Sequence, residues 1–159
     1  MPRRAGRVAE IAFAEYTAPS NRVLLDTHVW IGHFAPEAYP MSADALRAVS
    51  AAQQSGGMLV PDVAAWEIAL KAGRGSMRLQ LPVREWIDRA RLAPGTRMVP
   101  FTVELMMRTA ELPLGAPTDP FDRAIIVTAM AVGAPLVTAD RGIIQWAEQS
   151  GSFRVIAAR

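Results

Sequence analysis

The chain has 159 residues, no cysteine and a formal net charge of +2. A chain of this length can bury a hydrophobic core without covalent staples, so we expect a single domain. The absence of cysteine excludes disulfides, thiolate metal sites and cysteine nucleophiles, and leaves hard metal ions on oxygen ligands open.

The 17 basic residues include a single lysine, Lys71, and are unevenly distributed. Residues 71–97 carry seven basic side chains against two acidic ones, whereas residues 98–140 carry two against five. This arrangement suits a protein that holds a polyanion beside a cation. The alternative is an arginine-rich helical face that is simply solvated.

No apolar run reaches the roughly 18 to 20 residues that a membrane span needs. The first residues are basic, but Glu10 and Glu15 interrupt the apolar segment that a signal peptide would require. We therefore expect a cytoplasmic protein with no membrane contact. Residues 1–20 are predicted to form a flexible N-terminal extension ahead of a single domain at residues 21–159.

From residue 22 onward, short apolar runs alternate with helical patterns. The runs have no polar face, which is typical of buried parallel strands, and they lie at residues 23–25, 58–60, 98–99, 135–137 and 153–156. Capping residues, prolines and glycines predict helices at residues 42–54, 62–72, 102–111 and 119–132. This alternation predicts an α/β fold, a three-layer α/β/α sandwich with a central parallel sheet of four to five strands.

Acidic side chains follow the ends of two predicted strands. Asp26 comes directly after the first apolar run, and Asp140 is the third residue after the fourth. In an open parallel sheet, ligands bind beyond the carboxyl ends of the strands, where the strand order reverses. Asp119 and Asp122 open the helix that leads into the fourth strand, so we expect them at the same edge of the sheet.

Glu67 lies inside the helix predicted at residues 62–72, with Val63 and Leu70 as its i−4 and i+3 neighbours. This spacing puts its carboxylate at the border of the apolar face of the helix. A half-buried glutamate needs a partner or a cation, so Glu67 is a further candidate for the site.

Each acid also has a structural interpretation. Asp26, Asp119 and Asp140 precede helical segments and suit N-caps, and Asp119 with Asp122 is close to a capping box. Glu67 alone suits a solvated or salt-bridged position. Together, however, four or five carboxylates at one edge would repel one another unless divalent cations supplied positive charge. We expect Mg²⁺ or Mn²⁺ there, and such a site hydrolyses phosphodiesters.

Four motifs, in this order and approximate spacing, resemble those of the PIN-domain ribonucleases of the VapC toxin type. They are LLDTHVW at residues 24–30, WEIALK at 66–71, DPFDR at 119–123 and VTAD at 137–140. The resemblance covers about residues 22–157. It implies an endoribonuclease that uses Mg²⁺ to cleave RNA and is the toxin of a type II toxin–antitoxin pair. It also implies a small cognate antitoxin as inhibitor and a homodimer.

The resemblance assigns roles to individual residues by motif. The metal-binding acids correspond to Asp26, Glu67, Asp122 and Asp140, with Asp119 as a further catalytic acid. Thr27 and Thr138 flank two of these acids and are expected to orient them or to satisfy local backbone. Arg123 is expected to bind the phosphate or to pair with the neighbouring acids.

Other residues and functions stay open at this point. The basic stretch offers candidates for contacts to RNA or to the antitoxin, at Arg74, Arg78, Arg84 and Arg89. His28 could touch the substrate or pack beside Trp30. Haloacid-dehalogenase-type phosphotransferases need an aspartate where His28 stands, and dinucleotide-binding folds need a GxGxxG turn that is missing. A non-catalytic RNA- or protein-binding module on the same fold remains the alternative.

Overall fold

Among residues 13–159, five short strands form one parallel sheet at the centre of the protein. They are β1 (Val23–Leu25), β2 (Met58–Pro61), β3 (Thr96–Val99), β4 (Leu136–Thr138) and β5 (Val155–Ala157). The computed structural model describes residues 13–159. In the sheet the strands lie in the order β3-β2-β1-β4-β5, and every neighbouring pair is parallel. The predicted parallel sheet is confirmed, with all five apolar runs contributing strands.

Helices follow or link the strands. They are α2 (Thr27–Phe34), α3 (Ala43–Gln54), α4 (Asp62–Gly73), α5 (Val83–Arg91), α6 (Val103–Glu111), α7 (Pro120–Val132) and α8 (Arg141–Ser150), with a short 3-10 helix, η1 (Ala14–Tyr16), before them. The four helices given ranges from the sequence are confirmed as α3, α4, α6 and α7. Ser42 and Thr102 accept a backbone hydrogen bond at the starts of α3 and α6, and α7 stops where Gly133 adopts a φ of 65°.

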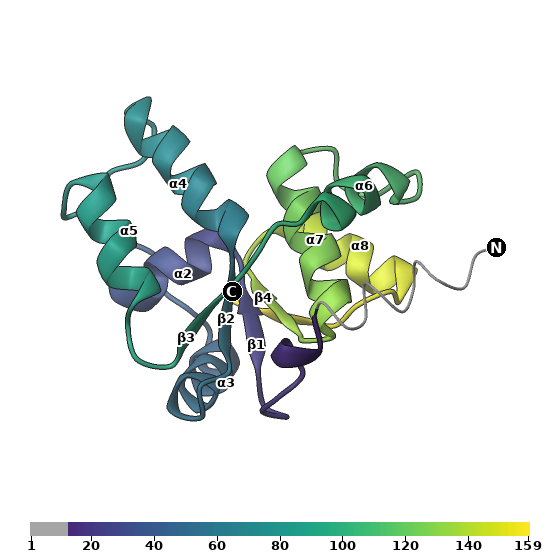
Figure 1. Cartoon of the computed structure of the whole chain (residues 1–159), viewed down its shortest axis with the longest axis horizontal. Helices are drawn as coiled ribbons and strands as arrows, with labels where there is room; N and C mark the ends of the chain where they lie inside the picture. Colours follow the sequence, from purple (N-terminus) through teal and green to yellow (C-terminus); the bar gives the residue numbers. More distant parts are fainter. Residues whose placement is uncertain (1–12) are drawn as a thin grey trace.

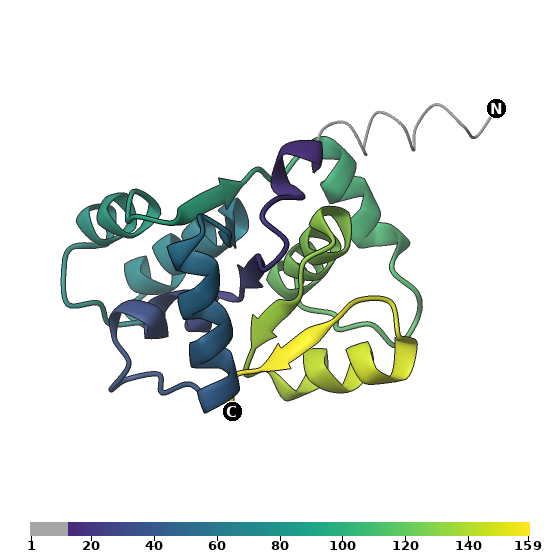
Figure 2. The same ribbon diagram turned by 90° about the horizontal axis from the view of Figure 1, so that it is seen from below.

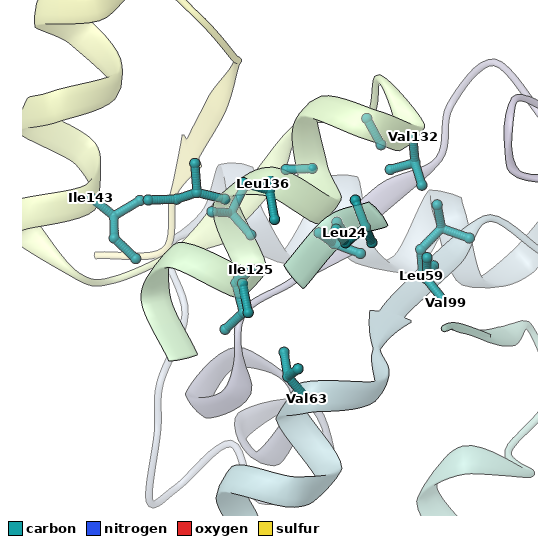
Figure 3. Close-up of a cluster of buried hydrophobic side chains, with 14 of the residues drawn as sticks. Leu24, Leu59, Val63, Val99, Ile125, Val132, Leu136 and Ile143 are labelled. Carbon is teal, nitrogen blue, oxygen red and sulfur yellow. The ribbon is translucent and has the colours of Figure 1, made fainter. Parts of the chain in front are cut away.

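The helices cover both faces of the sheet, which makes the predicted three-layer sandwich (Figures 1 and 2). Successive side chains of a strand point to opposite faces, so each strand supplies both cores. Leu24 and Leu136 point to the core that contains α6, α7 and α8, part of which Figure 3 shows. Leu25 and Val137 point to the core formed with α2, α3 and α5. The sheet is therefore buried on both faces, as its uniformly apolar strands require.

The segment before β1 packs against the domain where the structure describes it. Residues 1–12 of the predicted extension lie outside the described residues. Phe13 is 3% exposed and Tyr16 is 8% exposed, and both belong to the core with α7. The Tyr16 hydroxyl donates to the carbonyl of Met98 at 3.2 Å, and the Arg97 guanidinium lies 5.1 Å from the centre of the Tyr16 ring. Phe13 and Tyr16 thus add to the core beside β3.

The strand order reverses at β1. The chain runs outward from β1 to β2 and β3, and then returns to place β4 on the other side of β1. The connections after β1 and β4 therefore leave the sheet in different directions, which opens a crevice at their carboxyl ends. Asp26 directly follows β1, and Asp140 lies two residues after β4. Within residues 13–159, no helix has the length and apolar character needed to cross a membrane.

Candidate active site

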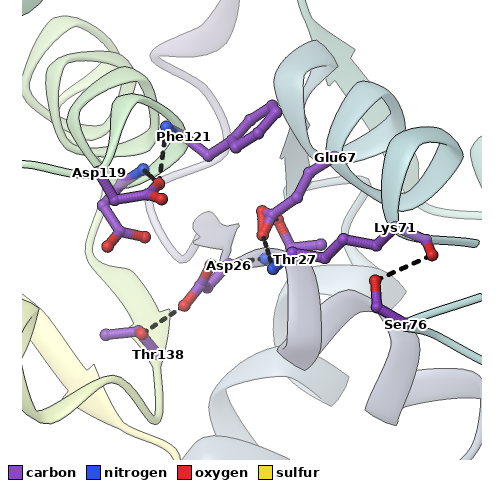
Figure 4. Close-up of polar contacts among 9 residues, drawn as sticks. Asp26, Thr27, Glu67, Lys71, Ser76, Asp119, Phe121 and Thr138 are labelled. Carbon is purple, nitrogen blue, oxygen red and sulfur yellow. Dashed lines mark hydrogen bonds and ion pairs between the residues drawn. The ribbon is translucent and has the colours of Figure 1, made fainter. Parts of the chain in front are cut away.

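All five predicted acids line one cavity at the carboxyl end of the sheet. Its volume is about 460 Å³, and its walls are formed by Asp26, His28, Tyr39, Glu67, Lys71, Asp119, Asp122, Ala139, Asp140 and Arg159. Figure 4 shows Asp119 and Glu67 on opposite sides, with Asp26 between them. Residues from four separate parts of the sequence thus meet at the edge where the strand order predicts a ligand.

Asp26 forms the buried floor of this cavity, with 7% of its surface exposed. As the N-cap of α2, it accepts the Thr27 amide at 2.7 Å through Oδ1. Its Oδ2 accepts the Thr138 hydroxyl at 2.5 Å. Burial raises the pKa of Asp26, and these two hydrogen bonds act in the opposite direction. Thr138 also accepts the Asp140 amide at 3.0 Å, so one hydroxyl connects two of the acids.

Glu67 is equally buried, at 6% exposed, and both of its carboxylate oxygens have partners. Oε2 accepts the Thr27 hydroxyl at 3.2 Å, and Oε1 pairs with Lys71 Nζ at 2.9 Å. A buried carboxylate needs such partners because desolvation penalises its charge. Thr27, the residue after Asp26 at the start of α2, therefore orients Glu67 on α4.

Asp119 and Asp140 are exposed N-caps that also face the cavity. Oδ1 of Asp119 accepts the amides of Phe121 at 2.9 Å and Asp122 at 3.1 Å, at the start of α7. Oδ1 of Asp140 accepts the Ile143 amide at 2.9 Å, at the start of α8. Each cap uses one carboxylate oxygen, so the second oxygen is left for another ligand. The positive ends of α2, α7 and α8 all meet this cavity and partly offset its negative charge.

The pKa of Asp122 is raised by its surroundings in the cluster of acids. Partial burial raises its pKa to about 7, and the charges of Asp119, Asp26, Asp140 and Glu67 add to that rise. In this conformation, no three acidic or imidazole side chains among residues 13–159 already converge at the spacing of a formed metal site. The donor chemistry nevertheless fits Mg²⁺ or Mn²⁺, because five oxygen-bearing acids repel one another around one open volume.

Arg123 donates hydrogen bonds to backbone carbonyls, and its contact with a phosphate stays a prediction. Its Nε donates to the carbonyl of Thr109 at 2.9 Å, and its Nη1 donates to the carbonyl of Pro117 at 2.9 Å. Among the described residues, no ion pair joins Arg123 to an acid. The guanidinium therefore holds the loop that leads into Asp119, and supports the site through the backbone.

The four arginines predicted to contact RNA lie outside the walls of the acidic cavity. Arg74 and Arg78 are exposed on the segment that leaves α4, and Arg84 and Arg89 are exposed on α5. Arg89 pairs with Glu85 at 2.6 Å, one turn away on the same helix. Such pairs suit a solvated helical face, so the contact of these arginines with RNA stays a prediction.

Four residues that line the cavity were not singled out from the sequence as members of the site: Tyr39, Lys71, Ala139 and Arg159. Lys71 could have been found from its i+4 spacing to Glu67, which brings opposite charges together on a helix. Tyr39 had no such signal, because its position depends on the loop after α2. That loop approaches Gly32 so closely that a Cβ there would lie 2.6 Å from the carbonyl oxygen of Tyr39. The Tyr39 ring lies 5.4 Å from that of His28, which therefore faces the cavity.

Known proteins share this arrangement. The PIN domain family model matches residues 23–149. Ribonuclease VapC22 of Mycobacterium tuberculosis (strain ATCC 25618 / H37Rv) is 35% identical over 121 residues, which cover 75% of this chain and 87% of that protein. The crystal structure of VapBC2 from Rickettsia felis, bound to a DNA fragment from their promoter, matches the fold with a TM-score of 0.60. That match has 14% identity and covers 86% of this chain and 98% of the other. The chain therefore belongs to the PIN-domain family and is of the VapC type.

Proposed function

We propose that this protein is an endoribonuclease that needs a divalent metal, Mg²⁺ or Mn²⁺, to hydrolyse RNA phosphodiester bonds. The observation that carries the proposal is the cavity lined by five carboxylates, in which mutual repulsion helps to raise the pKa of Asp122 to about 7. Repulsion of this kind is relieved when a cation binds. The similarity to ribonuclease VapC22 supports RNA as the substrate.

The proposed roles follow from the contacts of each side chain. The metal ligands would be Asp26, Glu67, Asp122 and Asp140. When bound, the metal would polarise the scissile phosphate and lower the pKa of the attacking water. Thr138 fixes Asp26, and Thr27 fixes Glu67, so these two ligands are oriented in advance. Asp119 keeps the oxygen that its cap does not use, and it would orient water beside the phosphate.

We further propose that the protein is a cytoplasmic toxin inhibited by a small cognate antitoxin, and that it forms a homodimer. The matched structure from Rickettsia felis is a VapBC2 assembly, which supports a partner protein here. Large apolar side chains are also exposed on α4 and α6, including Trp66 at 57% and Met106 at 47%. Sedimentation of the protein alone and with the product of an adjacent small reading frame would test both assemblies.

The direct test of activity is cleavage of a mixed pool of structured and single-stranded RNA by purified, antitoxin-free protein. We expect cleavage with Mg²⁺ or Mn²⁺, none with EDTA, and none for Asp26→Asn, which keeps a cap acceptor but loses the charge. The control is Asp44→Asn, since Asp44 is exposed on α3. Binding of RNA without cleavage under any metal would favour the non-catalytic module. A parallel DNA pool tests the choice of nucleic acid.

The basic stretch has its own test. Replacing Arg84 and Arg89 by Glu should weaken RNA binding and flatten its dependence on salt concentration, because phosphate contacts release counterions. Unchanged binding would assign these arginines to a solvated helical face. The measurement is fluorescence anisotropy of labelled single-stranded RNA between 50 and 200 mM salt, roughly the range over which such contacts are separated.

A further inference from the structure

Lys71 is the only lysine in the sequence, and its amine reaches the acidic cavity. The Nζ atom lies 2.9 Å from Oε1 of Glu67, and the Lys71 side chain is 41% exposed. Figure 4 shows this amine beside Glu67. A buried carboxylate is thus neutralised by an amine that still has access to solvent.

The backbone of Lys71 is fixed independently of this ion pair. Its carbonyl accepts the amide of Ser76 at 2.9 Å and the Ser76 hydroxyl at 3.0 Å, at the end of α4. The base of the side chain is therefore held in place, while its flexible stem lets the amine move. An ammonium group has three donors, so it can serve two anionic oxygens from one position.

The charges around the cavity leave few groups that would attract a phosphate. Five acids line it, and among the described lining residues only Lys71 and Arg159 are lysine or arginine. Lys71 is the one with an ion pair to an acid of the cluster. A cation bound by Glu67 would compete with the ammonium for the same carboxylate oxygen, because like charges repel at short range. The amine would then be available to another anion.

We propose that Lys71 is a phosphate ligand of the substrate, held ready on Glu67 and transferred to a non-bridging phosphate oxygen when a divalent cation engages Glu67. The inference rests on the proposed nuclease function. It assigns Lys71 a contact to nucleic acid, whereas a purely structural ion pair would only hold Glu67 in position.

The two roles predict different effects of Lys71→Met on Mn²⁺ binding. If Lys71 only holds Glu67, its loss disorders a metal ligand, and both Mn²⁺ binding and RNA binding weaken. If Lys71 is a phosphate ligand, its loss removes a competing charge from Glu67, so Mn²⁺ binds equally well or more tightly while RNA binds more weakly. Lys71→Arg keeps the charge and should restore RNA binding.

The experiment measures both affinities for the folded, full-length protein. Mn²⁺ binding is measured by isothermal titration calorimetry. Binding of a labelled 20-nucleotide single-stranded RNA is measured by anisotropy, with Ca²⁺ in place of Mg²⁺ to preserve the probe. For Lys71→Met we expect a loss of RNA affinity of about 3- to 10-fold and a log–log salt slope shallower by about 0.7, the value for one phosphate contact to a single strand.

A matched control and a chemical readout accompany these titrations. Arg108 forms an i,i+4 ion pair with Glu104 at 3.2 Å on α6, away from the walls of the cavity, so Arg108→Met should change neither affinity. Since Lys71 is the only lysine, acetylation of its amine followed by peptide mass spectrometry reports on one side chain. RNA with Ca²⁺ should protect Lys71 from acetylation.

An unchanged salt slope, weaker Mn²⁺ binding in Lys71→Met, or unprotected Lys71 would each overturn the inference. Its failure is distinguishable from that of the proposed function. If the wild-type protein cleaves RNA with Mg²⁺ but Lys71→Met keeps the wild-type slope, the inference alone is wrong. If the wild-type protein neither binds nor cleaves RNA, both are wrong.

Discussion

Replacing Asp122 by Asn should stabilise the metal-free protein, and the gain should depend on pH. The pKa of Asp122 in the fold is about 7 instead of the ordinary 3.8, because of partial burial and the surrounding acids. The folded state therefore binds a proton more tightly than the unfolded state. The stability that this proton contributes is fully present below about pH 4 and is lost as pH rises through 7.

The size of the effect follows from the shift. One pKa unit is worth about 1.4 kcal/mol, so a shift of about three units corresponds to about 4 kcal/mol. This figure is an upper limit. Asp122 is only partly buried, so solvent screening reduces this figure, and we expect about 1–2 kcal/mol. For a domain of this size, that free energy changes the melting temperature by about 3–6 °C.

The assay is thermal unfolding of the wild type, Asp122→Asn and Asp44→Asn in EDTA, followed by circular dichroism from pH 5 to pH 8. The advantage of Asp122→Asn should be roughly 40% of its full size at pH 5, because the loss begins near pH 4, and it should be largest at pH 8. Asp44→Asn should follow the wild type. The pKa of His33 is lowered by burial, but this residue is common to all three proteins and cancels from the differences.

Added Mn²⁺ should raise the melting temperature of the wild type more than that of Asp122→Asn. An advantage that is equal at every pH, or greater stability of the wild type at pH 8 in EDTA, would refute the electrostatic reasoning.

Three further substitutions test the supports of the site and the core. Thr138→Val removes a buried donor to the Asp26 carboxylate and should cost about 1–3 kcal/mol in urea unfolding, whereas Thr138→Ser should recover most of that loss. Arg123→Met leaves two loop carbonyls without their donor and should lower the free energy of unfolding by about 1–3 kcal/mol without raising the KM for RNA. A large rise in KM alone would instead indicate a phosphate contact. Tyr16→Ala should cost about 3 kcal/mol, because the ring is 8% exposed in the core; unchanged unfolding would show that the segment contributes little in solution.

The sheet could be predicted because its strands are short and apolar on both faces. Residues 23–25 and 135–137 have no polar side, which distinguishes a parallel strand under two helical layers from an amphipathic surface strand. Helices with clear ends could also be predicted from local sequence, because Ser42 caps the start of α3 and Gly133 ends α7, each through contacts within one helical turn. Helix α5 was not, because its arginines and acids dominate the composition and hide the buried Trp86 and Ala90.

What could not be predicted depends on contacts between distant segments. For Arg123 the sequence offered a phosphate contact or pairing with the neighbouring acids, whereas its guanidinium donates to the carbonyls of Thr109 and Pro117. Tyr39 reaches the cavity through a loop whose path is set by packing on Gly32. Such contacts are long-range or involve the backbone, and neither leaves a pattern in the residue types.

The capping and ligand interpretations of the acids are not exclusive, and the geometry explains why. Asp119 and Asp140 each cap a helix with Oδ1, while the other oxygen of each remains free of the cap. A helix that starts where the strand order reverses needs an acceptor for its first amides, and an aspartate supplies it together with a second oxygen that the cap does not use. The cap fixes the rotamer of the side chain, so the ligand is oriented before any ion binds.

Replacing Asp140 by Ser tests this argument, because serine keeps the cap but removes the second oxygen. Stability should change little, and Mn²⁺ affinity should fall at least tenfold, as expected for loss of a charged ligand. A large loss of stability with unchanged Mn²⁺ affinity would mean that Asp140 is a cap and nothing more.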